Sequence, residues 1–496
     1  MNAFIEIIEQ LIELIPGQSW LEHSGFPFKN LKKPQGKVFD ICLFGVNAQG
    51  ALGFAWVGFQ STSLFYTLPF RLARHSEDGD LITVTPWSLR DASYDSLFYE
   101  GWRSALQQRN PIPTAKGGFL GHNILADNPG IVAIGIWSDA RNSCVRLDCQ
   151  ETYKVFRTIE LNDHHSREVE ILRYLGGQTI FKNYAQLLGI FEYRNAKFNI
   201  RSNVAISMRY IKNNGTLFPL IASLIERARF PQRLKERAAK EAWQTLLNLL
   251  QSLGRIISDF HKAMTFPSRS TFLAAESYTE ETKKLWLETT EKKLFNSVVK
   301  VTKILSYYPN FKYLENSLSL MANKILKKIV EIDNLGLKIY IHSDLHLGQI
   351  IIGTDGLYLL DYEQNIKYQE EDLQEWQSQD EKHHCLEDVA SLILSIRFAW
   401  FQSANSIQHP SLISHGVTLA KIEHTFLKFY YNNIRENVAN SELLPKEETQ
   451  TETLLNFYYL LRVLNEIIYD ERAGNPRVRS WLEILQECIL DLSRRY

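Results

Sequence analysis

Polar side chains with metal-binding and proton-accepting oxygens stand out in the mostly apolar segment "IHSDLHLGQIIIGTDGLYLLDYEQ", residues 341–364. Asp344 and Asp361 carry carboxylates, Gln349 carries an amide oxygen, and His342 precedes them. A buried pair of strands has no structural need for so many polar groups, because burying each one is costly unless it is hydrogen-bonded. Mg²⁺ prefers oxygen ligands, and a carboxylate can accept a proton from a hydroxyl group. The segment therefore indicates chemistry on phosphates and hydroxyls.

The surrounding residues predict a strand, a loop and a hairpin. "KIYIH" predicts a strand that enters the loop "SDLHLG", and "QIIIG" and "LYLLD" predict two strands joined by the turn "GTDG". The two acids then lie at the start and the end of a short hairpin, where both can face one point. Asp344, Gln349 and Asp361 follow the spacing of the catalytic Asp, the Asn and the metal-binding Asp of protein kinases. Phosphoryl transfer requires these parts, and Gln offers the same amide oxygen as Asn.

Two other interpretations of the segment remain open. The alternation of His342, Asp344 and His346 also fits a zinc or two-metal hydrolase. Such a site needs further ligands, and the nearest candidates, His383 and His384, lie in a polar loop without a matching motif. Alternatively, the polar groups only cap a buried loop. We expect phosphoryl transfer because the groups share one hairpin at kinase spacing.

The composition of the whole chain narrows the class of protein. Its 496 residues are 45% hydrophobic and 22% charged, which is typical of a globular protein with about three domains. With 55 basic and 56 acidic residues the net charge is −1, so we expect neither nucleic acid nor a membrane as a partner. The five scattered cysteines show no CxxC spacing, which favours the reducing cytoplasm over a disulfide framework.

The N-terminal and neighbouring apolar stretches were the candidates for targeting or membrane segments. The first, residues 1–20, has no Lys or Arg before its apolar part and contains three glutamates, so it predicts an amphipathic helix and not a signal peptide. Residues 41–70 carry no charge, but polar residues and a proline interrupt them. A membrane span needs about 20 predominantly apolar residues, so this stretch predicts strands.

Three regions of different texture predict three domains. Residues 1–110 are strand-rich after the first helix and end near the loop-like "RNPIPTAKGGFLGHN". Residues 111–212 combine short strands with the helical segment "DHHSREVEILRYL", and residues 213–496 are helical apart from the hairpin described above. The predicted fold class is α+β.

The hairpin segment resembles a known signature. "HSDLHLGQIII" and "LYLLDYE" are similar to the "HGDLHLGQ…DFE" pattern of bacterial maltokinases and their glucosamine-kinase relatives, in the aminoglycoside-phosphotransferase-like superfamily. "YTLPFRLAR", "ARNSCVRLDCQETYKVFR", "ISMRYIKNNGTLF" and "LEDVASLILSI" resemble further segments of that family in the same order, over nearly the whole chain. The resemblance implies a bilobal, protein-kinase-like fold with a strand-rich N-terminal cap domain, a nucleotide-binding N-lobe and a helical C-lobe that carries the sugar site.

The resemblance also implies an ATP site in the region before residue 212. Lys154, in "TYKVFR", would contact the nucleotide phosphates. Glu170 is expected to pair with Lys154 and fix its position, with Glu168 as a neighbouring alternative. Together with Asp344 as the catalytic base, this assigns ATP and Mg²⁺ as cofactors.

Backbone contacts to the nucleotide are expected at two further places. A turn at Asn142 and Ser143 replaces the family's glycine-rich loop and, with Cys144, would offer N–H groups to phosphate oxygens. Met208 and Tyr210 lie in the segment that resembles the hinge between lobes and would supply backbone groups to the adenine.

The sugar side of the resemblance is less faithful. His346 lies close enough to Asp344 in sequence to reach a sugar hydroxyl, and Glu363, Glu466, Tyr469 and Trp481 are the other candidate sugar contacts.

Several positions depart from the family pattern. Aligned without gaps, the chain has Glu466 where the family has a Lys, and Ala473 and Gly474 where it has a Tyr-Glu pair. Replacing a cation by an anion reverses the local charge, so a conserved sugar pose is not assured. The basic segment "ERAGNPRVRSW" either rebuilds the pocket or is a solvated loop.

The resulting hypothesis is a cytoplasmic ATP- and Mg²⁺-dependent kinase that phosphorylates a sugar hydroxyl, with maltose to maltose 1-phosphate as the first choice. Another sugar or an amino sugar such as glucosamine is an alternative acceptor. A nucleotide-binding regulatory pseudokinase and a binding module built on the cap are hypotheses of a different class. The small-molecule sugar is the expected partner, and association with trehalose- or glycogen-metabolising enzymes is left open.

Overall fold

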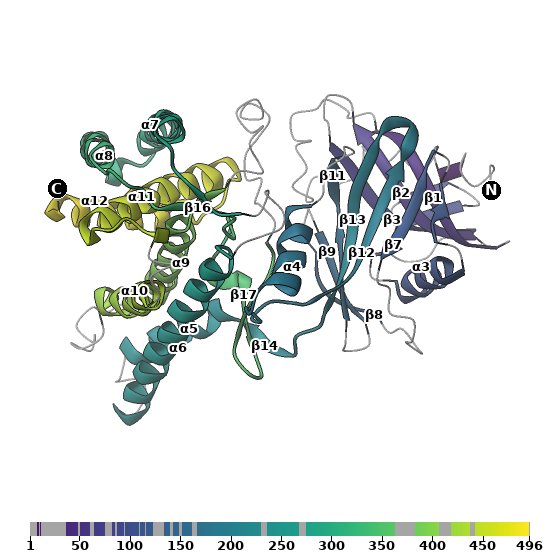
Figure 1. The fold of residues 1–496 in the computed structure, drawn as a ribbon, viewed down its shortest axis with the longest axis horizontal. Coiled ribbons are helices and arrows are strands. Elements are labelled where there is room, and N and C mark those ends of the chain that lie inside the picture. Colours follow the sequence, from purple (N-terminus) through teal and green to yellow (C-terminus); the bar gives the residue numbers. More distant parts are fainter. Residues whose placement is uncertain are drawn as a thin grey trace. The chain divides into compact units, whose positions relative to one another are not determined.

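The structure is a computed structural model of the chain, shown in Figure 1. It describes residues 7–8, 10, 36–47, 50–59, 64–74, 82–84, 87–93, 95–108, 110–114, 116–122, 133–138, 142–147, 151–160, 166–229, 236–266, 274–362, 382–405, 418–436 and 442–495. Most of the predicted N-terminal helix, and Glu363, lie outside the described residues. The chain divides into two compact units: a strand-rich unit of residues 1–176 and 185–212, and a helical unit of residues 177–184 and 213–496.

Two antiparallel sheets make up most of the strand-rich unit. The six-stranded sheet has the order β1-β2-β3-β5-β4, with β11 also paired to β3, and the seven-stranded sheet has the order β6-β7-β12-β13-β10-β9-β8. The first contains β1 (Gly36–Asn47), β2 (Gly50–Phe59), β3 (Leu64–Ala73), β4 (Ile82–Val84), β5 (Trp87–Asp91) and β11 (Thr158–Glu160). The second contains β6 (Ile112–Pro113), β7 (Gly118–His122), β8 (Ala133–Ser138), β9 (Asn142–Leu147), β10 (Glu151–Phe156), β12 (Leu187–Asn195) and β13 (Ile200–Arg209). The helices of this unit are α3 (Ser96–Gln108), α4 (Arg167–Gln178) and the short η3 (Ala196–Phe198).

Aromatic side chains from both sheets and from α3 share one core. The Trp102 ring on α3 lies 4.5 Å from the Phe191 ring of β12, and the Trp56 ring of β2 lies 4.5 Å from the Tyr193 ring. Phe54 of β2 contacts Trp102 at 4.9 Å between ring centroids. Aromatic side chains bury large apolar areas, so this shared core explains why the two sheets belong to one compact unit of residues 1–176 and 185–212. The predicted domain boundary near residue 110 stays a prediction.

A buried carboxylate also links the two sheets. Asp40 of β1 accepts hydrogen bonds from the Tyr193 hydroxyl at 2.7 Å and from the Thr114 hydroxyl at 2.5 Å. The backbone N–H of Lys116 donates to the same carboxylate at 3.1 Å. A buried carboxylate requires such partners, because an unpaired one would lose its hydration without compensation.

The helical unit carries most of its residues in long helices. These are α5 (Leu217–Arg229), α6 (Glu236–Ala263), α7 (Glu280–Leu305), α8 (Leu314–Val330), α9 (Leu386–Asn405), α10 (Leu419–Arg435), α11 (Glu448–Arg472) and α12 (Val478–Arg495), with the short η5 (Pro309–Phe311) and η6 (Leu347–Gln349). Helix α7 begins at a capping box in which Thr279 and Thr282 bond each other's backbone, which satisfies N–H groups left open at the helix start. Across the described ranges, no helix is both long and apolar enough to traverse a bilayer.

Helices α6 and α10 approach each other closely at Gly254. A Cβ atom at this position would lie 2.6 Å from the Phe426 carbonyl oxygen and 2.9 Å from the Tyr430 nitrogen. These distances are shorter than side chains tolerate, so the crossing requires glycine. The same crossing places Tyr430 of α10 beside His261 near the end of α6, with 2.9 Å between the hydroxyl and Nδ1.

One small antiparallel sheet contains the strand before residue 341, and a second contains the hairpin within residues 341–362. Strand β16 (Leu337–Ile339) pairs with β15 (Glu276–Ser277) and β19 (His383–His384), and β14 (Asn213–Thr216) pairs with β17 (Ile350–Gly353), which pairs with β18 (Leu357–Leu359). The predicted strand, loop and hairpin are therefore confirmed. The hairpin closes through a hydrogen bond of 2.8 Å from the Gly353 N–H to the Gly356 carbonyl.

Candidate active site

The loop that carries Asp344 is anchored through its backbone. Asp388, near the start of α9, accepts hydrogen bonds from the N–H groups of His342 at 2.7 Å and Ser343 at 2.9 Å. Ser343 has a φ of 75°, a conformation that non-glycine residues rarely adopt without support. The two bonds from Asp388 supply that support, so the course of the loop is fixed immediately before Asp344.

Asp388 is itself held by a buried chain of hydrogen bonds. The Nε2 of His261 lies 3.1 Å from the Asp388 Oδ2. Asp388, His261 and Tyr430 are all buried. Burial by itself raises the pKa of Asp388. The hydrogen bonds and charge interactions with His261 and His342 lower it by more, so the pKa of Asp388 lies below its ordinary value. An ionised Asp388 only accepts hydrogen bonds, so His261 donates to it from Nε2. The Nδ1 of the same ring is hydrogen-bonded to the Tyr430 hydroxyl, at 2.9 Å.

His342 connects the loop to the hairpin that follows it. Its ring is fully buried, and its Nε2 donates to the Leu360 carbonyl at 2.7 Å. The Leu360 N–H in turn donates to the Gln349 carbonyl at 2.9 Å. His342 therefore braces the backbone on either side of the predicted metal ligands.

The two predicted magnesium ligands are in direct contact. The Gln349 Nε2 donates to the Asp361 Oδ2 at 3.0 Å, so the amide of one side chain and the carboxylate of the other lie side by side. Asp361 has a φ of 63°, which turns the chain out of β18. Carboxylate and amide oxygens are hard oxygen donors of the kind that Mg²⁺ prefers, so Gln349 and Asp361 would hold the ion together with oxygens of the nucleotide phosphates. The residues present fit a magnesium ion.

Arg462, which contacts Asp344, was not among the residues predicted for the site. The guanidinium Nη2 on α11 lies 3.2 Å from the Asp344 Oδ1 and 2.8 Å from the Glu466 Oε1, one turn along the helix. The Asp344 side chain is 6% exposed and that of Arg462 20%, so the contact is largely shielded from water. The negative charge that the sequence places at Glu466 is therefore compensated locally by Arg462, one helical turn earlier. An Arg followed four positions later by a Glu on a predicted helix was the available signal.

The His346 side chain is hydrogen-bonded to the backbone of its own loop. Its Nδ1 accepts a hydrogen bond of 3.0 Å from the Gly348 N–H and caps η6. With His342 also bonded to the backbone, both histidines of the alternative zinc site have structural partners. In the described part of the chain, no three His, Cys, Asp or Glu side chains lie close enough together to hold a metal ion.

The remaining predicted sugar contacts divide between exposed and buried side chains. Tyr469 is 40% exposed and lies on the same face of α11 as Arg462, at helical spacing. Trp481 is 6% exposed, its indole N–H donates to Asp470 at 2.7 Å, and its ring stacks on Phe398 at 4.3 Å. A buried indole with its N–H satisfied favours a packing role over the predicted sugar contact.

The basic segment after α11 also has structural partners. Arg477 pairs with the buried Asp470 at 2.9 Å, and Arg479 lies 3.6 Å from Glu483. These two arginines therefore support the start of α12, and the interpretation of the segment as a rebuilt pocket loses its main candidates.

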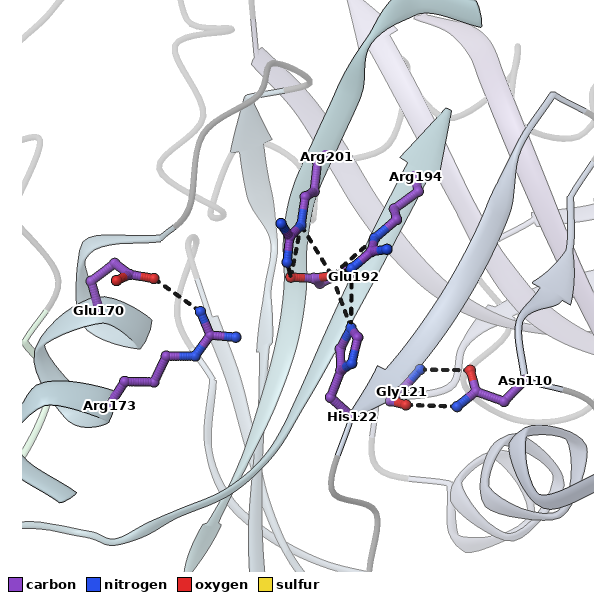
Figure 2. Close-up of polar contacts among 8 residues, drawn as sticks. All are labelled: Asn110, Gly121, His122, Glu170, Arg173, Glu192, Arg194 and Arg201. Carbon is purple, nitrogen blue, oxygen red and sulfur yellow. Dashed lines mark hydrogen bonds and ion pairs between the residues drawn. The ribbon is translucent and has the colours of Figure 1, made fainter. Parts of the chain in front are cut away.

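The strand-rich unit holds Lys154 in a buried ion pair. Its Nζ, on β10, lies 2.6 Å from the Glu168 Oε2 of α4, and both side chains are at most 3% exposed. Glu170 instead pairs with Arg173 on the same helix, at 3.0 Å (Figure 2). The prediction of Glu170 as the partner of Lys154 is therefore wrong, and the neighbouring alternative is the partner. Positions two apart on a helix face different directions, which is why only one of the two glutamates can reach β10.

Asn142 and Ser143 do not form the predicted turn. They are the first residues of β9 and lie opposite Phe156 and Val155 of β10. The predicted turn at these residues is therefore wrong, because both belong to a strand. Their backbone contact with phosphate oxygens stays a prediction. Cys144 lies directly opposite Lys154 on the neighbouring strand.

The predicted hinge residues lie at the end of β13. Met208 is paired in the strand and nearly buried, and Tyr210 follows the last residue of the strand. The Tyr210 hydroxyl accepts a hydrogen bond from Arg146 at 3.2 Å, and the guanidinium also lies over the ring. Their contact with adenine stays a prediction.

Comparison with known proteins identifies the fold. No protein-family model matches the sequence, and no curated protein matches it. Among solved structures, glucosamine kinase in complex with glucosamine, ADP and inorganic phosphate matches with a TM-score of 0.62 and 16% identity, covering 97% of this chain and 99% of that chain. Two further crystal forms of glucosamine kinase match at 16% identity and TM-scores of 0.61 and 0.62, again over 97% of this chain.

The extent of this match confirms the predicted fold class. Both chains are covered almost completely, so the mixed helix and sheet architecture with strand-rich N-terminal sheets is shared as a whole. The chain therefore has the α+β, kinase-like fold of glucosamine kinase. An identity of 16% extends the likeness to the fold and no further.

Proposed function

We propose that the chain is a phosphotransferase that moves the γ-phosphate of ATP to a hydroxyl group of a sugar. The observation that carries the proposal is the contact of Gln349 with Asp361 at 3.0 Å, on the hairpin that follows the anchored Asp344 loop. A catalytic carboxylate and a separate carboxylate–amide pair on adjoining segments are the parts that phosphoryl transfer needs. The shared fold with glucosamine kinase supports the same reaction class.

In the proposed mechanism Asp344 orients the acceptor hydroxyl and accepts its proton. Asp388 keeps the backbone before Asp344 in place through the two N–H groups, so little reorganisation accompanies the reaction. Gln349 and Asp361 would hold Mg²⁺, which supplies charge stabilisation on the nucleotide phosphates. Lys154, fixed by Glu168, would bind phosphate oxygens.

The surroundings of Asp344 support a polyhydroxylated acceptor. Arg462, Glu466 and the exposed Tyr469 line one face of α11 next to the catalytic carboxylate. Charged and hydroxyl groups of this kind fix the orientation of a polar ligand. We propose a sugar for this reason, with maltose, chosen from the motif, and glucosamine, the sugar bound in the matching solved structure, as the first two acceptors.

The test is ADP release from Mg-ATP with maltose, glucosamine, glucose, trehalose and an aminoglycoside as acceptors. Asp344→Asn is the matched control, since it keeps the shape of the side chain and removes the base. We expect acceptor-dependent turnover in the wild-type chain that the control lacks. Turnover that persists unchanged in Asp344→Asn would contradict the proposed base.

A regulatory role without turnover is the second candidate. The contact of Arg462 with Asp344 favours it, because a guanidinium on the catalytic carboxylate competes with the acceptor hydroxyl. Tight binding of ATP with no ADP release for any acceptor would favour this role. Maltose- or glucosamine-dependent turnover would exclude it.

A further inference from the structure

Three basic side chains surround one buried carboxylate on the seven-stranded sheet (Figure 2). Glu192 of β12 accepts from Arg194 Nη2 at 2.7 Å and from Arg201 Nη2 at 2.9 Å, on different carboxylate oxygens. The Nε of each arginine donates to the same carboxylate, at 3.1 Å for Arg194 and 3.2 Å for Arg201. His122 of β7 lies 2.9 Å from the Glu192 Oε2. We call these four residues the Glu192 cluster.

The cluster carries excess positive charge at its outer side. Glu192 is 0% exposed, whereas the side chains of His122, Arg194 and Arg201 are 36%, 39% and 36% exposed. Two guanidiniums and one carboxylate leave a net charge of +1 with His122 neutral. Arg194 and Arg201 lie directly opposite each other on β12 and β13. Like charges in that position destabilise a sheet, and Glu192 offsets only one of them.

The guanidiniums retain donors that Glu192 does not use. Each arginine directs Nε and Nη2 at the carboxylate, and within the ranges that the structure describes the Nη1 group of neither makes a hydrogen bond. A single arginine fork would satisfy one carboxylate. Both forks nevertheless point at Glu192, so the donors that the internal ion pair leaves unused are the Nη1 groups.

The cluster is rigid before any ligand arrives. Each arginine is fixed by two bonds to a buried acceptor. Strand β7 is fixed next to His122 by Asn110, whose side chain exchanges two hydrogen bonds with Gly121, at 2.7 and 3.1 Å (Figure 2). Groups that are already ordered lose little conformational entropy on binding.

The cluster is separate from the Lys154 position but shares its face of the sheet. Lys154 lies opposite Ile206 of β13, which lies opposite Ile190 of β12. Glu192 and Arg194 follow Ile190 at alternate positions of β12, on the same face. At about 3.3 Å per residue, Glu192 and Arg194 lie ~7 and ~13 Å along the strand from Ile190, the residue of β12 in line with Lys154. These distances exceed the reach of one phosphate group.

We propose that Arg194 and Arg201 form a binding site for a phosphate-type oxyanion, supplied as inorganic phosphate or as the phosphate group of a sugar phosphate. The exposed guanidinium groups donate to the oxygens of the anion, and Glu192 holds them in place. Guanidinium groups bind phosphate oxygens through charge-assisted N–H···O hydrogen bonds. The site is independent of the proposed transfer reaction.

The test is calorimetric titration of the full chain at low ionic strength with inorganic phosphate and, separately, with glucose 1-phosphate. We expect saturable binding, and at least a tenfold loss of affinity in Arg201→Gln. Glu192→Gln keeps an acceptor oxygen that positions the arginines and removes the internal negative charge, so it is expected to bind the anion more tightly than the wild-type chain. Arg173→Gln, which removes an exposed arginine on α4 outside the cluster, is expected to bind as the wild-type chain does.

Arg201→Gln is expected to weaken binding and Glu192→Gln to strengthen it, so either variant tests the proposal if the other folds poorly. Arg201→Lys keeps the charge without the fork and is expected to fall between the wild-type chain and Arg201→Gln. Equal affinity for both probes would identify the phosphate group as the ligand, and preference for glucose 1-phosphate would identify the ester as the source. No saturable binding, binding unchanged in Arg201→Gln, or binding of an acidic peptide alone would overturn the proposal.

Discussion

Buried carboxylates fix functional groups in both units, but their partners differ in kind. In the helical unit Asp388 accepts from two backbone N–H groups and from His261. In the strand-rich unit Glu168 is paired with the charged side chain of Lys154 at 2.6 Å. The first arrangement fixes a stretch of backbone, and the second fixes one side chain.

The difference determines which substitutions each region tolerates. A loop held through its backbone keeps its course when a side chain on it is replaced, because the anchoring N–H groups belong to every residue except proline. A position held by a buried ion pair depends on both charges, because removing one leaves the other without compensation. The following predictions test this contrast, from the largest expected effect to the smallest.

Asp344→Asn is expected to lower turnover by about 10²–10⁴-fold, the usual contribution of a general base. The loop should stay in place, since Asp388 anchors it before residue 344. Affinity for Mg-ATP, measured by calorimetry, should therefore change little while ADP release is lost. A parallel loss of ATP affinity and of thermal stability would show that the loop depends on the Asp344 side chain after all.

Asp388→Ala is expected to lower the free energy of unfolding by about 3–5 kcal/mol. The variant leaves two buried N–H groups and the His261 Nε2 without their acceptor. Urea denaturation measures the change, and Asp388→Asn, which keeps one acceptor oxygen, should lose less. A cost below about 1 kcal/mol for the alanine variant would mean that the loop has other anchors.

Glu168→Gln is expected to lower turnover by about 10²-fold, because Lys154 loses the charge that fixes its position. Glu170→Gln is the matched control on the same helix, where it removes only the ion pair with Arg173. Such exposed pairs contribute about 0.2–1 kcal/mol, so its turnover should stay within a few-fold of the wild-type value. Steady-state rates at saturating ATP compare the two variants. Equal losses would restore the original assignment of Glu170.

The contribution of Glu192 to the free energy of unfolding is expected to decrease as the pH falls below the unfolded-state pKa of its carboxyl group. Burial raises its pKa, but hydrogen bonds from Arg201, Arg194 and His122 lower it from the ordinary 4.5 to about 2. A carboxyl whose pKa is lowered by folding stabilises the native state above its unfolded pKa and loses that contribution as the pH falls. Between pH 7 and pH 3 the loss is about 2 kcal/mol. Urea denaturation at both values should show a smaller pH dependence in Glu192→Gln than in the wild-type chain; an equal dependence would contradict the assignment.

The sequence predicted best where the functional residues are close together along the chain. The strand, the loop and the hairpin of residues 337–362 follow from alternating apolar residues and a glycine-flanked turn, and the proximity of Gln349 and Asp361 follows from the hairpin. Local geometry leaves few alternatives over such a distance.

Contacts between residues far apart in the sequence could not be predicted from local patterns. Choosing between Glu168 and Glu170 requires knowing which face of α4 meets β10, and periodicity does not determine that face for a short helix with acids on both sides. The position of Asn142 depends on the register of β9 with β10, where a small shift converts a turn into a strand. Arg462 lies 118 residues from Asp344, and only tertiary packing of α11 brings them together.

Gly254 has a consequence for anyone who selects inactive variants of this protein at random. Substitution there would separate α10 from α6 and draw the Tyr430 hydroxyl away from His261, the residue that bonds Asp388. The damage would pass along three side chains to the loop before Asp344. A position with no functional group of its own would then appear in the selection beside the residues proposed to be catalytic.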